Sequence, residues 1–444
     1  MLERGARAFA RLLTGYFPDP FVFAVLMTAV AFALALVLTD ATAGATLIAW
    51  GDGLPGLMGF TAQIAITLLA AHALAHTDRL QALLARIGTL PRSAVAAYAL
   101  VVVTTAASSL IAWSLGLVAG ATIARAVAVH CARRDIVVHY PLLVASAYAG
   151  FVVWHMGYSG SAPLFVATPG HSLEAQIGLL PVTETIGTAF NGTVIILTVS
   201  ALCVLCPLLR PRDADTLPFE PPATAASEAQ NENTTSPAAR LANRRPLSIL
   251  LGGLLWAYLG LRWGQQGFVL TLDLVNWTLV GAGLLFARSL AHYARLILDA
   301  GATVGAIIIQ YPFYAGMLGI MTGTGLVQVL ADAFVSVANA DTLGLFAFLS
   351  AGLINLFIPS GGGQWAVQGP VFIEAARQLN VDPAAMVLAI AYGDQWTNLI
   401  QPFWTIPMLA IAGLPVQKII PYCFAALAVT GVIFAGALLW LGAG

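Results

Sequence analysis

Long apolar runs separated by short polar segments occupy most of this chain. Runs such as residues 21–38, 186–209 and 419–440 are long enough to cross about 30 Å of hydrocarbon as helices. The alternation of period two that marks a membrane β-barrel does not stand out. The pattern therefore predicts an all-α polytopic membrane protein.

A polar segment, residues 210–246, interrupts this pattern. It is rich in Pro, Ala, Ser, Thr and charged residues, a composition that cannot bury enough apolar surface to order itself. We expect a flexible cytoplasmic linker between a first membrane half, residues 1–209, and a second half, residues 247–444. Spans are expected near residues 21–38, 56–75, 94–129, 141–168 and 186–209 in the first half, and near 247–261, 268–286, 296–319, 343–376, 383–412 and 419–440 in the second.

Arginines and lysines predict the orientation, because they accumulate in short cytoplasmic loops. If Arg4, Arg7 and Arg11 lie inside, both ends of residues 94–129 are also inside, whereas both ends of residues 343–376 are outside. The N-terminus is then cytoplasmic and the C-terminus periplasmic.

Each half contains two places where polar residues break an apolar run. The second half has "NLFIPSGGGQWAVQGP" at residues 355–370 and "YGDQWTNLIQP" at 392–402; the first has "ASSLIAWSLG" at 107–116 and "WHMGYSGSAP" at 154–163. Lipid tolerates non-helical backbone only where it is buried in protein or lines a wet cavity. We therefore expect residues 94–129 and 343–376 to form re-entrant hairpins, the second arm of the latter beginning near Gln364. The four breaks are expected to converge on one cavity.

A weak internal repeat accompanies these breaks. Arg133 matches Arg377, and Ala-Ser-Ala-Tyr at residues 145–148 matches Ala-Ile-Ala-Tyr at 389–392. Since the two hairpins face opposite sides, the sequence predicts two inverted-topology repeats, each with a re-entrant hairpin and a discontinuous helix. This is an architecture of secondary transporters.

Polar residues at the breaks are the candidate site. The first backbone N–H groups of the arm that follows the three glycines would suit an anion. Asp394 is the one acid placed deep in a span, at a cost of about 2.5–3.5 kcal/mol, which favours a role as coupling-ion ligand or proton carrier over a structural cap. For His155, a functional and a structural role stay open. The candidate substrate-binding residues are Ser108, Ser109, His155, Ser159, Ser161, Ser360, Gly361, Gly362, Gly363, Gln364 and Trp365, and the candidate ion-coupling residues are Asp394, Gln395 and Asn398.

Other features carry less chemistry. With 59% hydrophobic residues, 9% charged residues and a net charge of −1, the lipid bilayer is the expected environment and nucleic acid is not an expected partner. His72 and His76 have a metal-like spacing without a third ligand nearby, so no metal or other cofactor is expected. Glu374 and Arg377 should pair on one helix face, and Trp365, Trp396 and Trp404 are either pocket-lining or interfacial.

The segments "LFIPSGGGQWAVQGP", "AYGDQWTNLIQPFW" and "HMGYSGSAPL" strongly resemble the bacterial short-chain fatty acid uptake family, permeases for acetoacetate and butyrate-like monocarboxylates within an ion-transporter superfamily. The resemblance covers nearly the whole chain. It implies import across the bacterial inner membrane by cation symport, in a carrier built from inverted repeats with two re-entrant hairpins. Members of the superfamily often carry Ser-Asn-Thr at hairpin tips for sodium; Ser-Gly-Gly-Gly here favours a proton and leaves both ions open.

The sequence thus predicts a secondary-active importer of short-chain fatty acids that works by alternating access. A carboxylate-permeable channel or facilitator is the nearest alternative. A dicarboxylate carrier is less favoured, because no basic residue is clearly placed among the breaks. An enzyme is not expected, since neither H-E-x-x-H nor G-x-S-x-G occurs. Chain-length preference, coupling ion, stoichiometry and oligomeric state, a homo-oligomer included, stay open.

Overall fold

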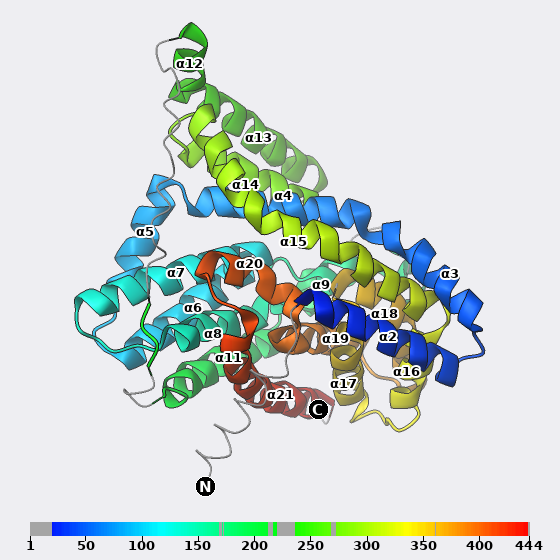
Figure 1. The fold of residues 1–444 in the computed structure, drawn as a ribbon. Coiled ribbons are helices and arrows are strands. Elements are labelled where there is room, and N and C mark those ends of the chain that lie inside the picture. The colour runs from blue at the N-terminus through cyan, green and yellow to red at the C-terminus, as the bar shows by residue number, and fades with distance from the viewer. Residues whose placement is uncertain are drawn as a thin grey trace.

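The computed structural model describes residues 20–167, 171, 173–211, 216–219, 236–267, 272–359 and 361–442. Every regular element in these residues is a helix (Figure 1). Seven of the described helices are long and apolar enough to cross a membrane, and eight if Ile308–Gly323 and Leu326–Val335, bent by 64°, count as one span. The predicted all-α membrane class is confirmed. Ser360, the N-terminal arginines and most of the predicted linker lie outside the described residues.

One group of helices forms the upper part of the molecule in Figure 1, except for its member α2, which lies lower in the view. Helix α4 packs against α14 and α15, α13 packs on α14, and α3 crosses α15. The two helices cross so closely that a Cβ on Gly319 would lie 2.2 Å from the Ala49 carbonyl oxygen. Only glycine fits at this position. The members are α2 (Pro20–Leu38), α3 (Ala43–Gly53), η1 (Leu54–Leu57), α4 (Met58–Ala75), α13 (Arg245–Gln266), α14 (Leu272–Phe286) and α15 (Leu290–Gly323), with α12 (Pro237–Ala242) before α13.

The remaining helices form the core group, in which one order of elements occurs twice. Two helices joined at a break are followed by a helix that is itself broken and then by a long span. The first series is α5 (Asp78–Gly88), α6 (Ala94–Ile111), α7 (Trp113–Arg133), α8 (Tyr140–Gly150), η2 (Phe151–Met156), α9 (Ser161–Val166), α10 (Glu174–Ile177), η3 (Val182–Glu184) and α11 (Ala189–Leu208). The second is α16 (Leu326–Val335), α17 (Leu343–Asn355), α18 (Gly361–Leu379), α19 (Pro383–Thr397), η5 (Asn398–Ile400), α20 (Pro402–Ala412), η6 (Val416–Lys418) and α21 (Ile420–Gly442). An inverted relation between the two series stays a prediction.

The two series pack into each other. Helix α7 of the first contacts α20 of the second, α9 contacts α18 and α19, and α11 lies against α21. At each break, at least one flanking helix therefore packs against the other half. Ala112, His155, Asn355 and Asp394, which lie at or beside the breaks, are buried in protein.

Local chemistry explains the breaks. Ala112, between α6 and α7, has extended backbone with φ −154° and ψ 130°. After η2 the chain passes through Gly157, where a Cβ would lie 2.4 Å from the Leu110 carbonyl oxygen, so the loop can approach the tip of α6 only without a side chain. In the second half, Pro402 begins α20, a position where a missing N–H costs nothing.

The beginning of α18 differs from the expectation. The helix starts at Gly361 rather than near Gln364, so that prediction is wrong and the three glycines form the first helical turn. Each glycine costs about 1 kcal/mol of helix propensity. Packing of α18 on α9, α17 and α19 offsets this cost, and the absence of side chains lets the helix start reach the two breaks.

Part of the predicted linker is held against the core group. The Leu217 carbonyl accepts a hydrogen bond of 2.8 Å from the Tyr140 N–H, and the Leu217 N–H donates to His139 Nδ1 at 3.0 Å. The ring of Phe219 packs edge-on against Tyr140, with 4.8 Å between centroids. Residues 216–219 are therefore docked at the start of α8.

Candidate functional site

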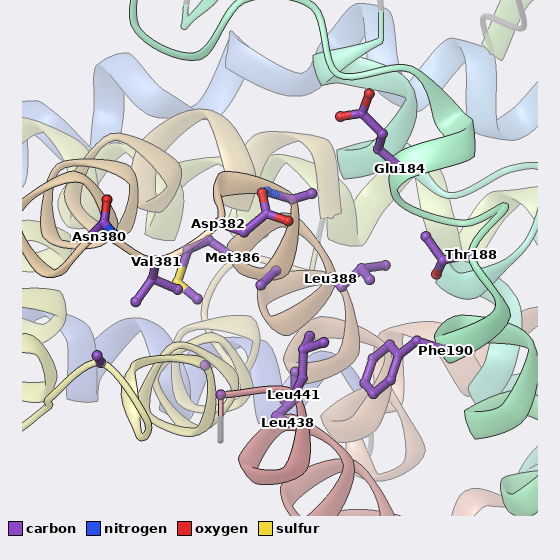
Figure 2. A pocket seen from close by; sticks show the side chains of 15 residues that line it. Glu184, Thr188, Phe190, Asn380, Val381, Asp382, Met386, Leu388, Leu438 and Leu441 are labelled. Carbon is purple, nitrogen blue, oxygen red and sulfur yellow. The ribbon is translucent and has the colours of Figure 1, made fainter. Parts of the chain in front are cut away.

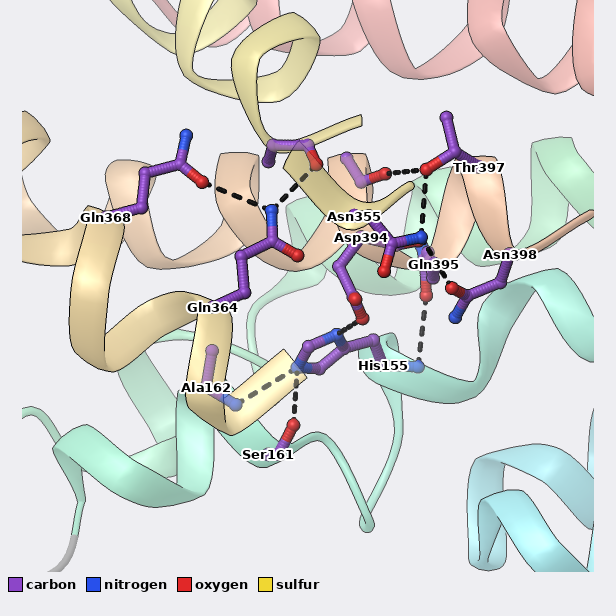
Figure 3. Close-up of polar contacts among 12 residues, drawn as sticks. His155, Ser161, Ala162, Asn355, Gln364, Gln368, Asp394, Gln395, Thr397 and Asn398 are labelled. Atoms are coloured by element: carbon purple, nitrogen blue, oxygen red, sulfur yellow. Dashed lines mark hydrogen bonds and ion pairs between the residues drawn. The ribbon is translucent and has the colours of Figure 1, made fainter. Parts of the chain in front are cut away.

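His155 and Asp394 join the broken helices of the two halves. His155 lies in η2 and Asp394 in α19, and the Nδ1–Oδ2 distance is 2.8 Å with both side chains fully buried (Figure 3). His155 Nε2 lies 3.0 Å from the Ala162 backbone nitrogen. Because that N–H can only donate, Nε2 is the acceptor and the ring proton of the neutral imidazole sits on Nδ1. Asp394 Oδ2 therefore accepts, and Oδ1 has no hydrogen-bond partner among the described residues.

The first residue of α18 rests on this pair. A Cβ at Gly361 would lie 2.4 Å from His155 Cε1, 2.6 Å from Ser161 Oγ and 3.0 Å from Asp394 Oδ2. The N–H groups in the first turn of a helix have no acceptor within the helix and lie at the positive end of its dipole. The start of α18 thus brings a favourable environment for a negative charge to the buried histidine and acid.

The break between α6 and α7 contacts the loop after His155 and not the His155–Asp394 pair itself. The Trp113 N–H donates to Ser159 Oγ at 2.9 Å, and the Tyr158 N–H donates to the Leu110 carbonyl at 2.7 Å. Ser109 is buried but bonds back to Thr105 of its own helix. The structure therefore gives Ser159 a positioning contact, while Ser108 and Ser109 have no described contact with His155 or Asp394.

Buried amide side chains surround Asp394. Asn355, the last residue of α17, places Nδ2 2.9 Å from the Asp394 carbonyl, 2.9 Å from Thr397 Oγ1 and 2.7 Å from Asn398 Oδ1. Gln395 Oε1 accepts the His155 N–H at 3.0 Å. These amides connect the end of α17, the break after α19 and His155 in one network of hydrogen bonds.

A second pair of amides lies on α18. Gln364 Nε2 donates to the Ala351 carbonyl of α17 at 2.7 Å and contacts Gln368 Oε1 at 3.1 Å. Gln368 Nε2 in turn donates to Ser350 Oγ at 2.8 Å. Asn355, Thr397 and Gln368 were not among the candidates, although Asn355 opens the broken motif and Gln368 lies one helical turn after Gln364.

Aromatic rings cover one side of His155. The Trp154 ring stacks on the imidazole with 4.3 Å between centroids, and Trp404 lies 5.5 Å from Trp154 and 5.4 Å from Trp113. Of the candidate tryptophans, Trp404 thus joins the site. Trp365 is fully buried in α18, and Trp396 donates its indole N–H to the Leu427 carbonyl of α21. Trp154 was missed, although it directly precedes His155.

Comparison with known proteins decides the family. A family model described as "Short chain fatty acid transporter" matches residues 1–441. The chain belongs to this family. Relatives in Escherichia coli (strain K12) and Haemophilus influenzae, both named as candidate short-chain fatty acid transporters, are 38% and 34% identical, each over 98% of both chains. Among solved structures, the YdaH transporter of Alcanivorax borkumensis is 16% identical with a TM-score of 0.43, and the match covers 96% of this chain and 98% of that one.

This short-chain fatty acid transporter family member also has a cavity of about 420 Å³ at the N-terminal end of α19 (Figure 2). Its lining includes the carboxylates of Glu184 and Asp382 and the apolar side chains of Phe190, Met386 and Leu438. None of the candidate site residues that the structure describes lines it. The residues that line the cavity lie on the side of the membrane that the sequence predicts to be periplasmic. The cavity is several turns of α19 away from Asp394.

Two lesser expectations can also be compared with the structure. Glu374 and Arg377 form the predicted pair, with Arg377 Nη2 and Glu374 Oε1 2.7 Å apart on an exposed face. His72 and His76 stack with 4.0 Å between ring centroids, and no group of three His, Cys, Asp or Glu side chains that could hold a metal ion occurs in the described part of the chain.

Proposed function

We propose that this protein is a secondary-active transporter that imports short-chain fatty acids, of the acetoacetate and butyrate type, across a bacterial inner membrane by cation symport. Membership of the short-chain fatty acid transporter family supports the substrate class. One observation carries the mechanism: the start of α18 lies against His155 of one broken helix and Asp394 of the other. A small anion bound there would contact both halves, as alternating access requires.

Electrostatics supplies a reason for coupling. A substrate carboxylate at the first turn of α18 would lie close to the Asp394 carboxylate. Two such charges about 6 Å apart repel by roughly 3 kcal/mol at an effective dielectric constant of about 20, which is about a hundredfold in affinity. A proton or a metal cation at Asp394 removes this repulsion. By linkage, the bound anion strengthens cation binding by the same factor, so the two are carried together.

The other groups then have distinct tasks. Ser161 and the backbone N–H groups of Gly361 and Gly362 would hold the carboxylate. The rings of Trp154 and Trp404 would contact the short acyl chain, because they offer an apolar wall directly beside His155. A wall of large, packed rings suits a short chain better than a long one.

Uptake into proteoliposomes tests this function. Radiolabelled butyrate and acetoacetate should accumulate above the equilibrium level when a proton or a sodium gradient is imposed, with saturation and with counterflow driven by unlabelled substrate. Uptake that neither saturates nor shows counterflow would indicate a channel instead. Stronger competition by succinate than by butyrate would indicate a dicarboxylate carrier.

A further inference from the structure

We propose that Asn355 Oδ1, Gln364 Oε1 and Asp394 Oδ1 together form a binding site for Na⁺, and that Na⁺ is the cation coupled to uptake. The side chains are fully buried, and each of these three oxygens lacks a hydrogen-bond partner within the described part of the chain. Figure 3 shows the three side chains near one another between the end of α17, the start of α18 and α19, where Asn355 bonds the Asp394 carbonyl. The proposal rests on the proposed function, since it names the ion used at the same site.

Main-chain contacts fix which amide atom is the oxygen. Asn355 Nδ2 bonds the Asp394 carbonyl, and Gln364 Nε2 bonds the Ala351 carbonyl. A carbonyl oxygen only accepts, so the atom facing it must be the NH₂ group of the amide. The opposite atom of the amide is therefore the oxygen in both residues. Three acceptors without a donor thus lie at this junction, and one of them belongs to a carboxylate.

Counting hydrogens shows that neither a proton alone nor a water molecule alone satisfies the three oxygens. A proton on Asp394 Oδ1 would donate one hydrogen bond and leave one amide oxygen without a donor. A water molecule has two hydrogens and would also leave one of the three oxygens unsatisfied. Leaving a buried polar atom unsatisfied costs about 1–3 kcal/mol. A protonated Asp394 would need a bound water molecule as well to satisfy all three oxygens. A hard cation takes carboxylate and amide oxygens as ligands at the same time, so a single Na⁺ satisfies all three.

The unpaired donors lie elsewhere in the network. Gln395 uses its oxygen for the His155 N–H and Asn398 uses its oxygen for Asn355, so each has an NH₂ group without a described partner. Donors suit the substrate carboxylate. The unpartnered atoms therefore reverse part of the assignment expected from the sequence. The Gln364 oxygen is assigned to the cation, and the NH₂ groups of Gln395 and Asn398 are assigned to the substrate carboxylate.

Thermal unfolding of the purified full chain in detergent tests the site without substrate. NaCl is titrated against choline chloride at constant ionic strength and neutral pH. A ligand that binds only the folded state raises the unfolding temperature in a saturable way, and we expect this response to Na⁺ and not to choline. Equal unfolding temperatures in the two salts would overturn the site.

Matched variants locate the effect. Loss of a residue that supports a metal ligand weakens metal binding by roughly 10- to 100-fold, so Gln364→Met, which removes a ligand, should weaken the Na⁺ response by at least about tenfold. Gln401→Met is the control, because Gln401 is equally buried but has both amide atoms partnered, with Leu356 and Phe403; its Na⁺ response should equal that of the wild type. If Gln364→Met does not fold, Gln364→Glu, which keeps an acceptor, should retain a response to Na⁺. An unchanged response in Gln364→Met, or its loss in Gln401→Met, would contradict the assignment.

The two proposals can fail separately. Concentrative uptake driven by a proton gradient alone, with no stabilisation by Na⁺, would leave the transport function and remove the sodium site. Stabilisation by Na⁺ without any butyrate or acetoacetate uptake would leave the site and remove the proposed substrate.

Discussion

His155 Nδ1 donates a hydrogen bond of 2.8 Å to Asp394 Oδ2, and neither side chain is exposed. The two residues lie 239 positions apart in the sequence, each at the break of its own half. The Ala162 N–H fixes the tautomer of the histidine, so the contact holds one carboxylate oxygen and leaves the other available. A buried acid held in this way can take up a cation without moving its side chain.

The pair should behave as an energetic unit. His155→Leu removes the donor to Asp394 and should cost about 1.5–3 kcal/mol, the range for a hydrogen bond to a charged group. In an Asp394→Asn background the same change should cost less, because the charge that needs the donor is gone. Thermal unfolding of both single variants and the double variant measures the coupling, expected at about 0.5–3 kcal/mol. Glu374→Gln, which removes a charge from an exposed ion pair outside the site, is the control. If the effects of His155→Leu and Asp394→Asn on the free energy of unfolding were strictly additive, the contact between the two residues would be incidental.

Gly361 and Gly362 give a matched test of the helix start. A Cβ on Gly361 would clash with His155 Cε1 at 2.4 Å, whereas one on Gly362 meets only Ser161 Cβ at an ordinary 3.6 Å. Gly361→Ala should therefore reduce butyrate uptake at least about tenfold, and Gly362→Ala should stay near the wild type. Alanine favours a helix over glycine by about 1 kcal/mol, so a loss in Gly361→Ala cannot come from helix propensity. Equal uptake by the two variants would mean that α18 does not contact the pair during transport.

The docked segment near Leu217 should respond to pH. Burial, with a contribution from Lys418, lowers the pKa of His139, in the loop before α8, to about 4, and neutral Nδ1 accepts the Leu217 N–H. Docking is therefore fully stabilised above the ordinary histidine pKa of about 6.5 and weakens as the pH falls from there toward 4. The hydrogen-exchange protection factor of the Leu217 amide should fall over this range.

His139→Asn is the control for that measurement, because its side-chain oxygen can replace Nδ1 as an acceptor and does not titrate. Protection of Leu217 in this variant should be independent of pH between about 4 and 6.5. A pH-dependent loss that persists in His139→Asn would place the titrating group elsewhere.

The sequence singled out the two polar residues, His155 and Asp394, that the structure brings together at the candidate site. Asp394 and His155 were noticeable because a charged or polar group inside an apolar run demands compensation, and each is located at a break. The all-helical class followed from the length of the apolar runs in the same way. These inferences need only the local pattern and the properties of the bilayer.

What could not be predicted depends on contacts between distant segments. Three glycines predict a turn, yet α18 begins at Gly361 because its first turn packs against residues of the other half. Ser159 seemed equivalent to Ser161, but its Oγ accepts a hydrogen bond from Trp113, the first residue of α7. The hydrogen bond from Asn355 to the Asp394 carbonyl likewise depends on the packing of α17 against α19.

Butyrate transport by Asp394→Asn in proteoliposomes tests the central claim most directly, with concentrative uptake and counterflow measured on the same preparation. Asparagine removes the charge and nearly keeps the shape, so the variant should lose accumulation driven by an ion gradient and retain counterflow of labelled for unlabelled butyrate. Accumulation at the wild-type level under the same gradient would contradict the claim that Asp394 couples the cation to the substrate.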